Sequence, residues 1–178
     1  MFSKQDESFV TKYHLLGLIL ISFISIPLHF TYDWLGGNAL VGLFTPINES
    51  IWEHLKLVFF PLLLWWLIGY LVFRQSKRIS LAKWLPASVI SILISMTFIV
   101  SWYYTWVHAL NVESSIIDIG SLFIAVPLGQ LVAIHIYKVI EPRIIYSILS
   151  FIFLMVTAFA FIWFTIHTPG LPIFAPPN

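Results

Sequence analysis

Five long apolar stretches constrain the fold of this 178-residue chain more than any other feature. Each is close to the ~20 apolar residues that a helix needs to cross the hydrocarbon core of a bilayer. Charged residues make up only 10% of the chain, against about 25% in soluble domains, so such a surface would aggregate in water. The sequence therefore predicts an all-α, polytopic membrane helix bundle that forms one domain over residues 1–178. The expected transmembrane helices are 13–32, 48–73, 85–107, 118–140 and 143–167.

The distribution of lysine and arginine predicts how the bundle is oriented. The N-terminal tail and the loops expected after the second and fourth spans carry basic residues, whereas the other two loops and the C-terminal tail carry none. Because basic residues favour the cytoplasmic side, we expect a plasma-membrane protein with a cytoplasmic N-terminus and an extracytoplasmic C-terminus. The residues on the expected inner side are Lys4, Lys12, Arg74, Lys77, Arg78, Lys83, Lys138 and Arg143.

Composition excludes several classes of site. No cysteine is present, so disulfides, thiolate metal sites and cysteine nucleophiles are excluded. The net charge of +1 is too small to suggest a nucleic-acid partner. No glycine-rich phosphate loop of the G-x-x-x-x-G-K-[ST] type is present. The lipid bilayer is the expected partner, together with a lipid or small-molecule substrate, and the sequence predicts no oligomeric state.

Small residues predict where helices pack closely. They recur at every fourth position of the fourth span, and a similar stripe of serines lies on the third span. These residues are Ser121, Ala125, Gly129 and Ala133 on the fourth span, and Ser88, Ser91 and Ser95 on the third.

The most informative polar segment opens the second span, where residues 46–56 read PINESIWEHLK. Ionisable side chains beside a membrane helix are costly to place there, and by default they mark a functional site. Glu49 and Glu53 are four residues apart, which puts both carboxylates on one face of a helix that begins at residue 48. Lys56 then lies just below them, and Asn48 caps the helix N-terminus.

The first span contributes further candidates. His29 and Asp33 lie four residues apart near its outer end, so they share a helix face. The loop 35–45 is short and apolar, which keeps the first two spans adjacent. We therefore expect His29 and Asp33 to meet the segment 46–56, with the loop folded over the site. His108 and His167 are expected near the same membrane face.

Residues 42–57 (GLFTPINESIWEHLKL), together with Leu28-His29-Phe30 and Asp33-Trp34, resemble a family of small bacterial multi-pass membrane proteins. That family carries only a domain-of-unknown-function label. The similarity extends over the whole chain and is sharpest in the segment 46–56. The resemblance implies a polytopic bacterial membrane protein and implies no reaction.

The first functional hypothesis is a divalent-metal site. Histidines and carboxylates bind zinc, and a position left open for water supplies a nucleophile near neutral pH. The protein would then be a membrane hydrolase acting on a lipid or lipid-linked substrate from the outer leaflet. The candidate ligands are His29, Asp33, Glu49, Glu53 and His54, with contributions from His108 and His167. The candidate catalytic residues are Glu49, Glu53, His54 and Lys56, of which Lys56 would steady a phosphate or an oxyanion.

Two other functional classes stay open at this point. Lys56 beside Glu53 would suit a proton- or ion-coupled transporter or a channel subunit, with Gln130 continuing the path. The same lysine and glutamate would also suit a charge-compensated helix entrance, capped by Asn48, in a non-catalytic interaction or sensor protein.

A haem protein is the last alternative. His14 and His29 lie near opposite ends of the first span, ~22 Å apart at ~1.5 Å per residue. With His135 facing His14 and another outer histidine facing His29, paired histidines would ligate two haems.

Overall fold

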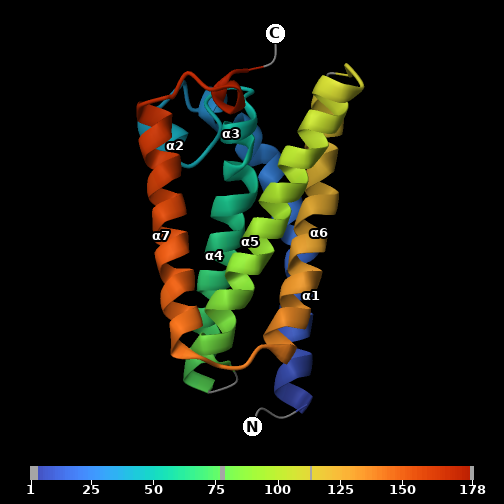
Figure 1. Cartoon of the computed structure of the whole chain (residues 1–178), viewed down its shortest axis with the longest axis vertical. Helices are drawn as coiled ribbons and strands as arrows, with labels where there is room; N and C mark the ends of the chain where they lie inside the picture. The colour runs from blue at the N-terminus through green and yellow to red at the C-terminus, as the bar shows by residue number, and fades with distance from the viewer. Residues whose placement is uncertain (1–3, 77–78, 113, 177–178) are drawn as a thin grey trace.

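The computed structural model describes residues 4–76, 79–112 and 114–176, and Figure 1 shows the whole chain. Only the backbone is described for residues 4–7, 76, 108 and 115. Every regular element in this part of the chain is helical. The elements are α1 (Lys4–Trp34), α2 (Ala39–Gly42), α3 (Ile51–His54), α4 (Lys56–Phe73), η1 (Arg74–Ser76), α5 (Leu81–Tyr103), the π-helical η2 (Tyr104–Ala109), α6 (Ser115–Val139), α7 (Ile144–Ile166) and η3 (Pro172–Phe174).

Five helical segments of the described chain are long and apolar enough to cross a membrane, which confirms the predicted fold class. They are Ser8–Trp34, Ile51–Phe73, Leu81–Val107, Ile116–Val139 and Ile144–Ile166. The first helix extends well before residue 13, because α1 continues through the polar N-terminal residues.

The second span begins at Ile51 and not at Asn48, because Ser50 caps its N-terminus. Ser50 has an extended backbone, and its hydroxyl accepts a hydrogen bond from the Glu53 amide at 3.4 Å. The Asn48 side chain instead accepts the Ser50 amide at 2.9 Å, which forms a turn before the helix. Leu55 joins α3 to α4 with helical backbone angles, so the two helices form one span.

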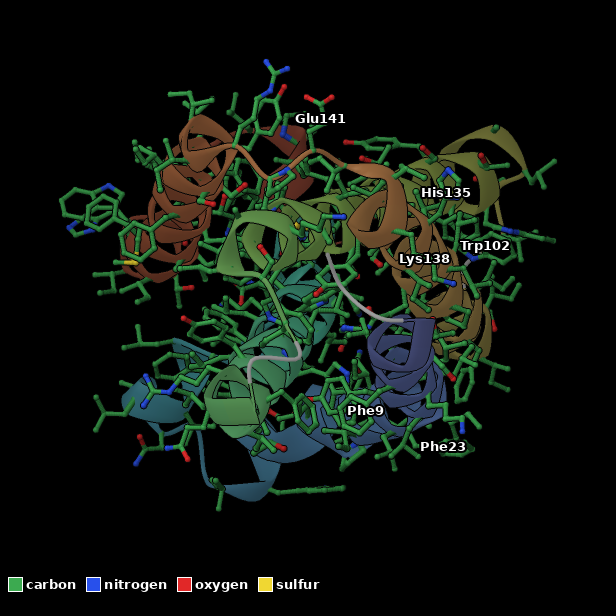
Figure 2. The ribbon with its side chains drawn as sticks, turned by 90° about the horizontal axis from the view of Figure 1, so that it is seen from below. Phe9, Phe23, Trp102, His135, Lys138 and Glu141 are labelled. Atoms are coloured by element: carbon green, nitrogen blue, oxygen red, sulfur yellow. The ribbon has the colours of Figure 1, made fainter. Side chains whose placement is uncertain are left out.

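The centre of the bundle is α5, which packs against α4, α6 and α7, while α1 packs against α4 and α6. In Figure 2, seen from the N-terminal end, α7 lies at the edge opposite α1. At the α5–α6 contact, a Cβ on Gly129 would overlap the Ser91 carbonyl and the Ser95 hydroxyl. The Ser95 hydroxyl also donates to the Ala125 carbonyl at 2.9 Å. The small-residue stripes therefore lie at the close helix contact that they predicted.

The two ends of the bundle differ in what they carry (Figure 1). The C-terminal end holds the chain between α1 and α4, including α2 and α3, together with η3. The connections from α4 to α5 and from α6 to α7 lie at the N-terminal end. The polar segment 46–56 is thus at the same end as the last turns of α1 and α7.

Candidate metal centre

Three side chains from two regions of the chain meet at the C-terminal end of the bundle. His29 lies near the end of α1, His54 ends α3, and Glu49 lies just before α3. The Nε2 atoms of the two histidines are 2.9 Å apart. The Oε2 atom of Glu49 is 3.5 Å from Nε2 of His29 and 3.4 Å from Nε2 of His54. Within the described residues, these three form a group whose donor atoms are close enough to hold one metal ion.

The triangle of donor atoms has the size that a zinc ion requires. The point equidistant from its three corners lies about 1.9 Å from each atom, while Zn²⁺ binds histidine nitrogen and carboxylate oxygen at ~2.0–2.2 Å. His29, Glu49 and His54 would therefore hold the ion as three protein ligands, which is the number that catalytic zinc sites use.

The His54 ring is oriented by the backbone in the way that metal-binding histidines usually are. Its Nδ1 atom lies 3.0 Å from the carbonyl oxygen of Ser50, which only accepts hydrogen bonds, so Nδ1 carries the proton. The Nε2 atom of a neutral ring is then left with its lone pair facing His29 and Glu49. The Nδ1 atom of His29 is buried and has no hydrogen-bond partner among the described residues.

Glu49 connects this group to the solvent. Its side chain is 59% exposed, whereas the side chains of His29 and His54 are 7% and 11% exposed. When no metal ion is bound and His54 is protonated, its hydrogen bond to Glu49 is the main effect that lowers the pKa of the Glu49 carboxyl below its usual value. The charges of His54 and His29 act in the same direction, and partial burial opposes them. The centre therefore combines one ionised, water-facing carboxylate with two buried imidazoles.

A small cavity adjoins the two histidines and extends the site toward α6. It has a volume of ≈ 10 Å³, which is about enough for one water molecule. His29 and His54 form one part of its wall, and Asp118, in the first turn of α6, forms another. The remaining lining residues are Ile51, Leu57, Ile99, Trp102, Tyr103, Ile119, Ser121 and Leu122. Asp118 was not among the predicted site residues, because no spacing relates it to the segment 46–56.

Glu53 does not join the metal group and pairs with Lys56 instead. Its Oε2 atom is 2.6 Å from the Lys56 ammonium, and the two side chains are 4% and 0% exposed. The prediction that Glu49 and Glu53 share a helix face is wrong, because Glu49 precedes the first residue of the helix. The two carboxylates therefore serve two separate clusters.

The Glu53–Lys56 pair holds three parts of the chain together. The Lys56 ammonium also donates to the carbonyl oxygens of Gly42 at 2.7 Å and Thr45 at 3.4 Å, so it has three acceptors in all. The Glu53 carboxylate accepts the Ile47 amide and the hydroxyl of Thr165 in α7. The first loop is thus folded over the mouth of α4 and bound there by a buried lysine.

Two other predicted ligands, Asp33 and His167, do not belong to the metal group. Asp33 is exposed near the end of α1 and belongs to no group of metal-binding geometry in the described chain. His167 is exposed and stacks on Trp163, with ring centroids 4.2 Å apart. The His108 side chain is outside the described part of the structure.

The histidines of the haem hypothesis are not arranged as it requires. The His14 ring is fully buried, and its ring neighbours are Trp66, Trp84 and Tyr13. His135 is exposed on α6, and Figure 2 shows it on the outside of the bundle. The two rings therefore do not face each other.

Comparisons with known proteins place the chain in a family but not in a reaction class. The sequence profile of a family of unknown function (DUF6512) matches residues 2–177, which is nearly the whole chain. No curated protein and no solved structure matches it.

Proposed function

The chain belongs to the DUF6512 family of unknown function, and we propose that it is a zinc-dependent membrane hydrolase with His29, Glu49 and His54 as metal ligands. The observation that supports this proposal is the triangle of donor atoms, with sides of 2.9, 3.4 and 3.5 Å. Two neutral imidazoles and one carboxylate are a ligand set of catalytic zinc sites, which keep a fourth position for water.

Each residue of the centre has a defined part in this proposal. His29, His54 and Glu49 hold the ion, and the Ser50 carbonyl keeps the His54 ring in its ligating tautomer. Zinc in such a site lowers the pKa of its bound water to about 7 and so supplies a nucleophile. Asp118, across the water-sized cavity, is the base that accepts the proton of the attacking water.

The proposed substrate is a lipid or lipid-linked molecule whose scissile bond lies at the membrane surface. The centre is near the end of the first span and the start of the second, and its Glu49 ligand faces water. Basic residues of the described chain lie around the opposite end of the long helices, at Arg74, Lys83, Lys138 and Arg143. By the positive-inside rule, we place the centre at the extracytoplasmic face of the plasma membrane.

Transport is less well supported by the interior of the bundle. A proton or ion path from the outer site would have to pass the buried serines of α1. Ser25 donates to the carbonyls of Ile21 and Leu57, and Ser22 donates to those of Leu18 and Leu122. Hydroxyls used in this way hold helices together and do not form a chain of side-chain relays.

Metal analysis of the detergent-purified protein tests the ligand set. After incubation with Zn²⁺ and dialysis, we expect stoichiometric zinc in the parent protein and little in the His54→Ala and Glu49→Gln variants. The matched control is His167→Ala, which removes an exposed histidine at the same end and should retain zinc. A parent protein that stays metal-free with both Zn²⁺ and Co²⁺ would overturn the metal centre.

Hydrolysis is tested separately, on the zinc-loaded protein in vesicles that contain phospholipid and a lipid-linked diphosphate. We expect release of water-soluble head groups, loss of release with a chelator, and at least about a 100-fold decrease in Asp118→Asn with zinc retained. A zinc-loaded protein that releases nothing from either lipid would contradict the hydrolase. Ion flux in the same vesicles that requires Lys56 would favour the transporter instead.

A further inference from the structure

An apolar groove lies between α4 and α7, in the half of the bundle nearer the N-terminal end. Its volume is ≈ 270 Å³, and α5 forms its floor. Each wall is one face of a helix, because its residues recur at steps of three or four. The walls include Leu63, Leu67 and Tyr70 in α4, and Phe151, Met155 and Ala158 in α7.

The groove is open to the surrounding lipid and apolar inside. On its walls, Leu67 and Met155 are 49% and 56% exposed, whereas Trp84 and Ser88 of the floor are each 1% exposed. The Trp84 indole and the Ser88 hydroxyl both donate to backbone carbonyls, at 2.8 and 2.7 Å. The polar groups of the floor are therefore already bonded, and the groove suits an apolar chain that enters from the bilayer.

The length of the groove matches one leaflet. Both walls belong to segments that are long and apolar enough to span a membrane. Leu63, at the deep end, lies ten residues before Phe73, where the second span ends. This corresponds to ~15 Å at ~1.5 Å per residue, which is half of the ~30 Å hydrocarbon core. A lipid held at the N-terminal end would thus extend its chain along the groove to the middle of the membrane.

A cation lies at that end of the groove. Arg74 directly follows α4, and its backbone amide donates to the carbonyl of Tyr70, so it continues the groove face of α4 by one turn. Its side chain is exposed and has no carboxylate partner among the described side chains, whereas Arg143 is paired with Glu141 at 2.7 Å. A guanidinium binds phosphate through two parallel hydrogen bonds.

We propose that the groove binds an acyl chain of an anionic phospholipid whose phosphate is held by Arg74. Charge complementarity favours this ligand over a neutral lipid, and the apolar walls favour it over a free anion. Basic sites between transmembrane helices bind anionic lipids on the cytoplasmic side, which is where the positive-inside rule places this end. The lipid site is independent of the metal centre, because the two share no residue.

Native mass spectrometry of the full-length protein tests the role of charge, with phosphatidylglycerol and phosphatidylcholine of the same acyl chains as probes. We expect phosphatidylglycerol to bind at least about 5-fold more tightly, and Arg74→Gln to remove this preference, because one basic residue near the membrane surface contributes about that factor. The matched control is Lys138→Gln, which removes an exposed cation at the same end but on α6, away from α7 (Figure 2). The preference should be unchanged in this control.

Two outcomes of that titration would overturn the proposal. Equal affinities of the parent protein for the two lipids would show that no cation selects the head group. Equal losses of preference in Arg74→Gln and Lys138→Gln would show that the positive end of the bundle acts as a whole. Both substitutions change exposed side chains, so both variants should fold.

Ala158→Phe tests the groove itself. A phenyl ring at this wall position fills the deep end, so both lipids should bind at least about 10-fold more weakly, since excluding two methylene groups already costs that factor. Ala160→Phe adds the same ring to α7 at a position that does not line the groove, and it should bind both lipids as the parent protein does. Equal binding of phosphatidylglycerol by the two folded variants would place the chain elsewhere and contradict the site.

Discussion

Replacing Lys56 with methionine should destabilise the protein more than a substitution of the exposed Glu49. The substitution keeps an unbranched side chain that is one atom shorter and removes a fully buried ammonium that has three acceptors. Glu53, whose side chain is 4% exposed, is left as an uncompensated buried charge. Removing one partner of a buried ion pair costs about 3–5 kcal/mol, so we expect a loss of that size in the free energy of unfolding.

The double variant Lys56→Met, Glu53→Gln separates the ion pair from simple packing. Glutamine keeps an oxygen that accepts the Ile47 amide, and its NH2 group takes the place of the other oxygen, which faces the Thr165 hydroxyl. The substitution also removes the unpaired charge. The loss in the double variant should therefore be smaller than the sum of the two single losses by about 1–3 kcal/mol.

The assay is reversible unfolding in mixed micelles, followed by tryptophan fluorescence and far-UV circular dichroism. Zinc content is measured on the same samples, and it should be retained in folded Lys56→Met because the ion pair and the metal group share no residue. A loss below about 1 kcal/mol in Lys56→Met, or strictly additive losses in the double variant, would refute a buried, coupled pair.

The remaining predictions concern Glu49 and the contact between α5 and α6. Because the folded-state pKa of Glu49 lies below its ordinary value of 4.5, its contribution to stability is present above that value and is lost as the pH falls through the lowered pKa. The free energy of unfolding of the metal-free protein should therefore fall at low pH, and this fall should be smaller in Glu49→Gln. An equal fall in the variant would contradict the contact of Glu49 with His54. At the helix contact, Gly129→Ala should cost about 1–3 kcal/mol because its methyl group would overlap Ser91 and Ser95, whereas Gly120→Ala should stay within about 0.5 kcal/mol in the same unfolding assay.

Local sequence is enough to predict the helices, because each span satisfies its backbone amides and carbonyls with hydrogen bonds inside the same segment. A stretch such as Ile51–Phe73 has no other way to satisfy its amides and carbonyls in lipid than to form a helix. The small residues of α6 likewise predict a close helix contact, since only a short side chain permits it. The Glu53–Lys56 pair was one of the predicted interpretations for the same reason, because residues three apart are neighbours on a helix.

The first residue of a helix is harder to predict. The second span was expected to begin at residue 48 and begins at Ile51, and this difference changes which residues form the site. Asn48 and Ser50 are both good N-cap residues, and the choice between them decides whether Glu49 is inside the helix. Ser50 is the cap, so Glu49 is free to turn toward His29 while Glu53 turns toward Lys56. The two carboxylates of this segment therefore have different partners: Glu49 contacts the two histidines, and Glu53 forms an ion pair with Lys56.

The sequence by itself determined that this protein is a bundle of five apolar helices with a cluster of ionisable groups at the mouth of the second, because bilayer thickness and hydrogen bonding act on each segment locally. Only the tertiary structure decided which of those groups meet. The contact of His29 with His54 and the position of Asp118 across the cavity depend on how three helices are rotated and packed. Such rotations are set by side-chain contacts between segments far apart in the chain, and no local spacing encodes them.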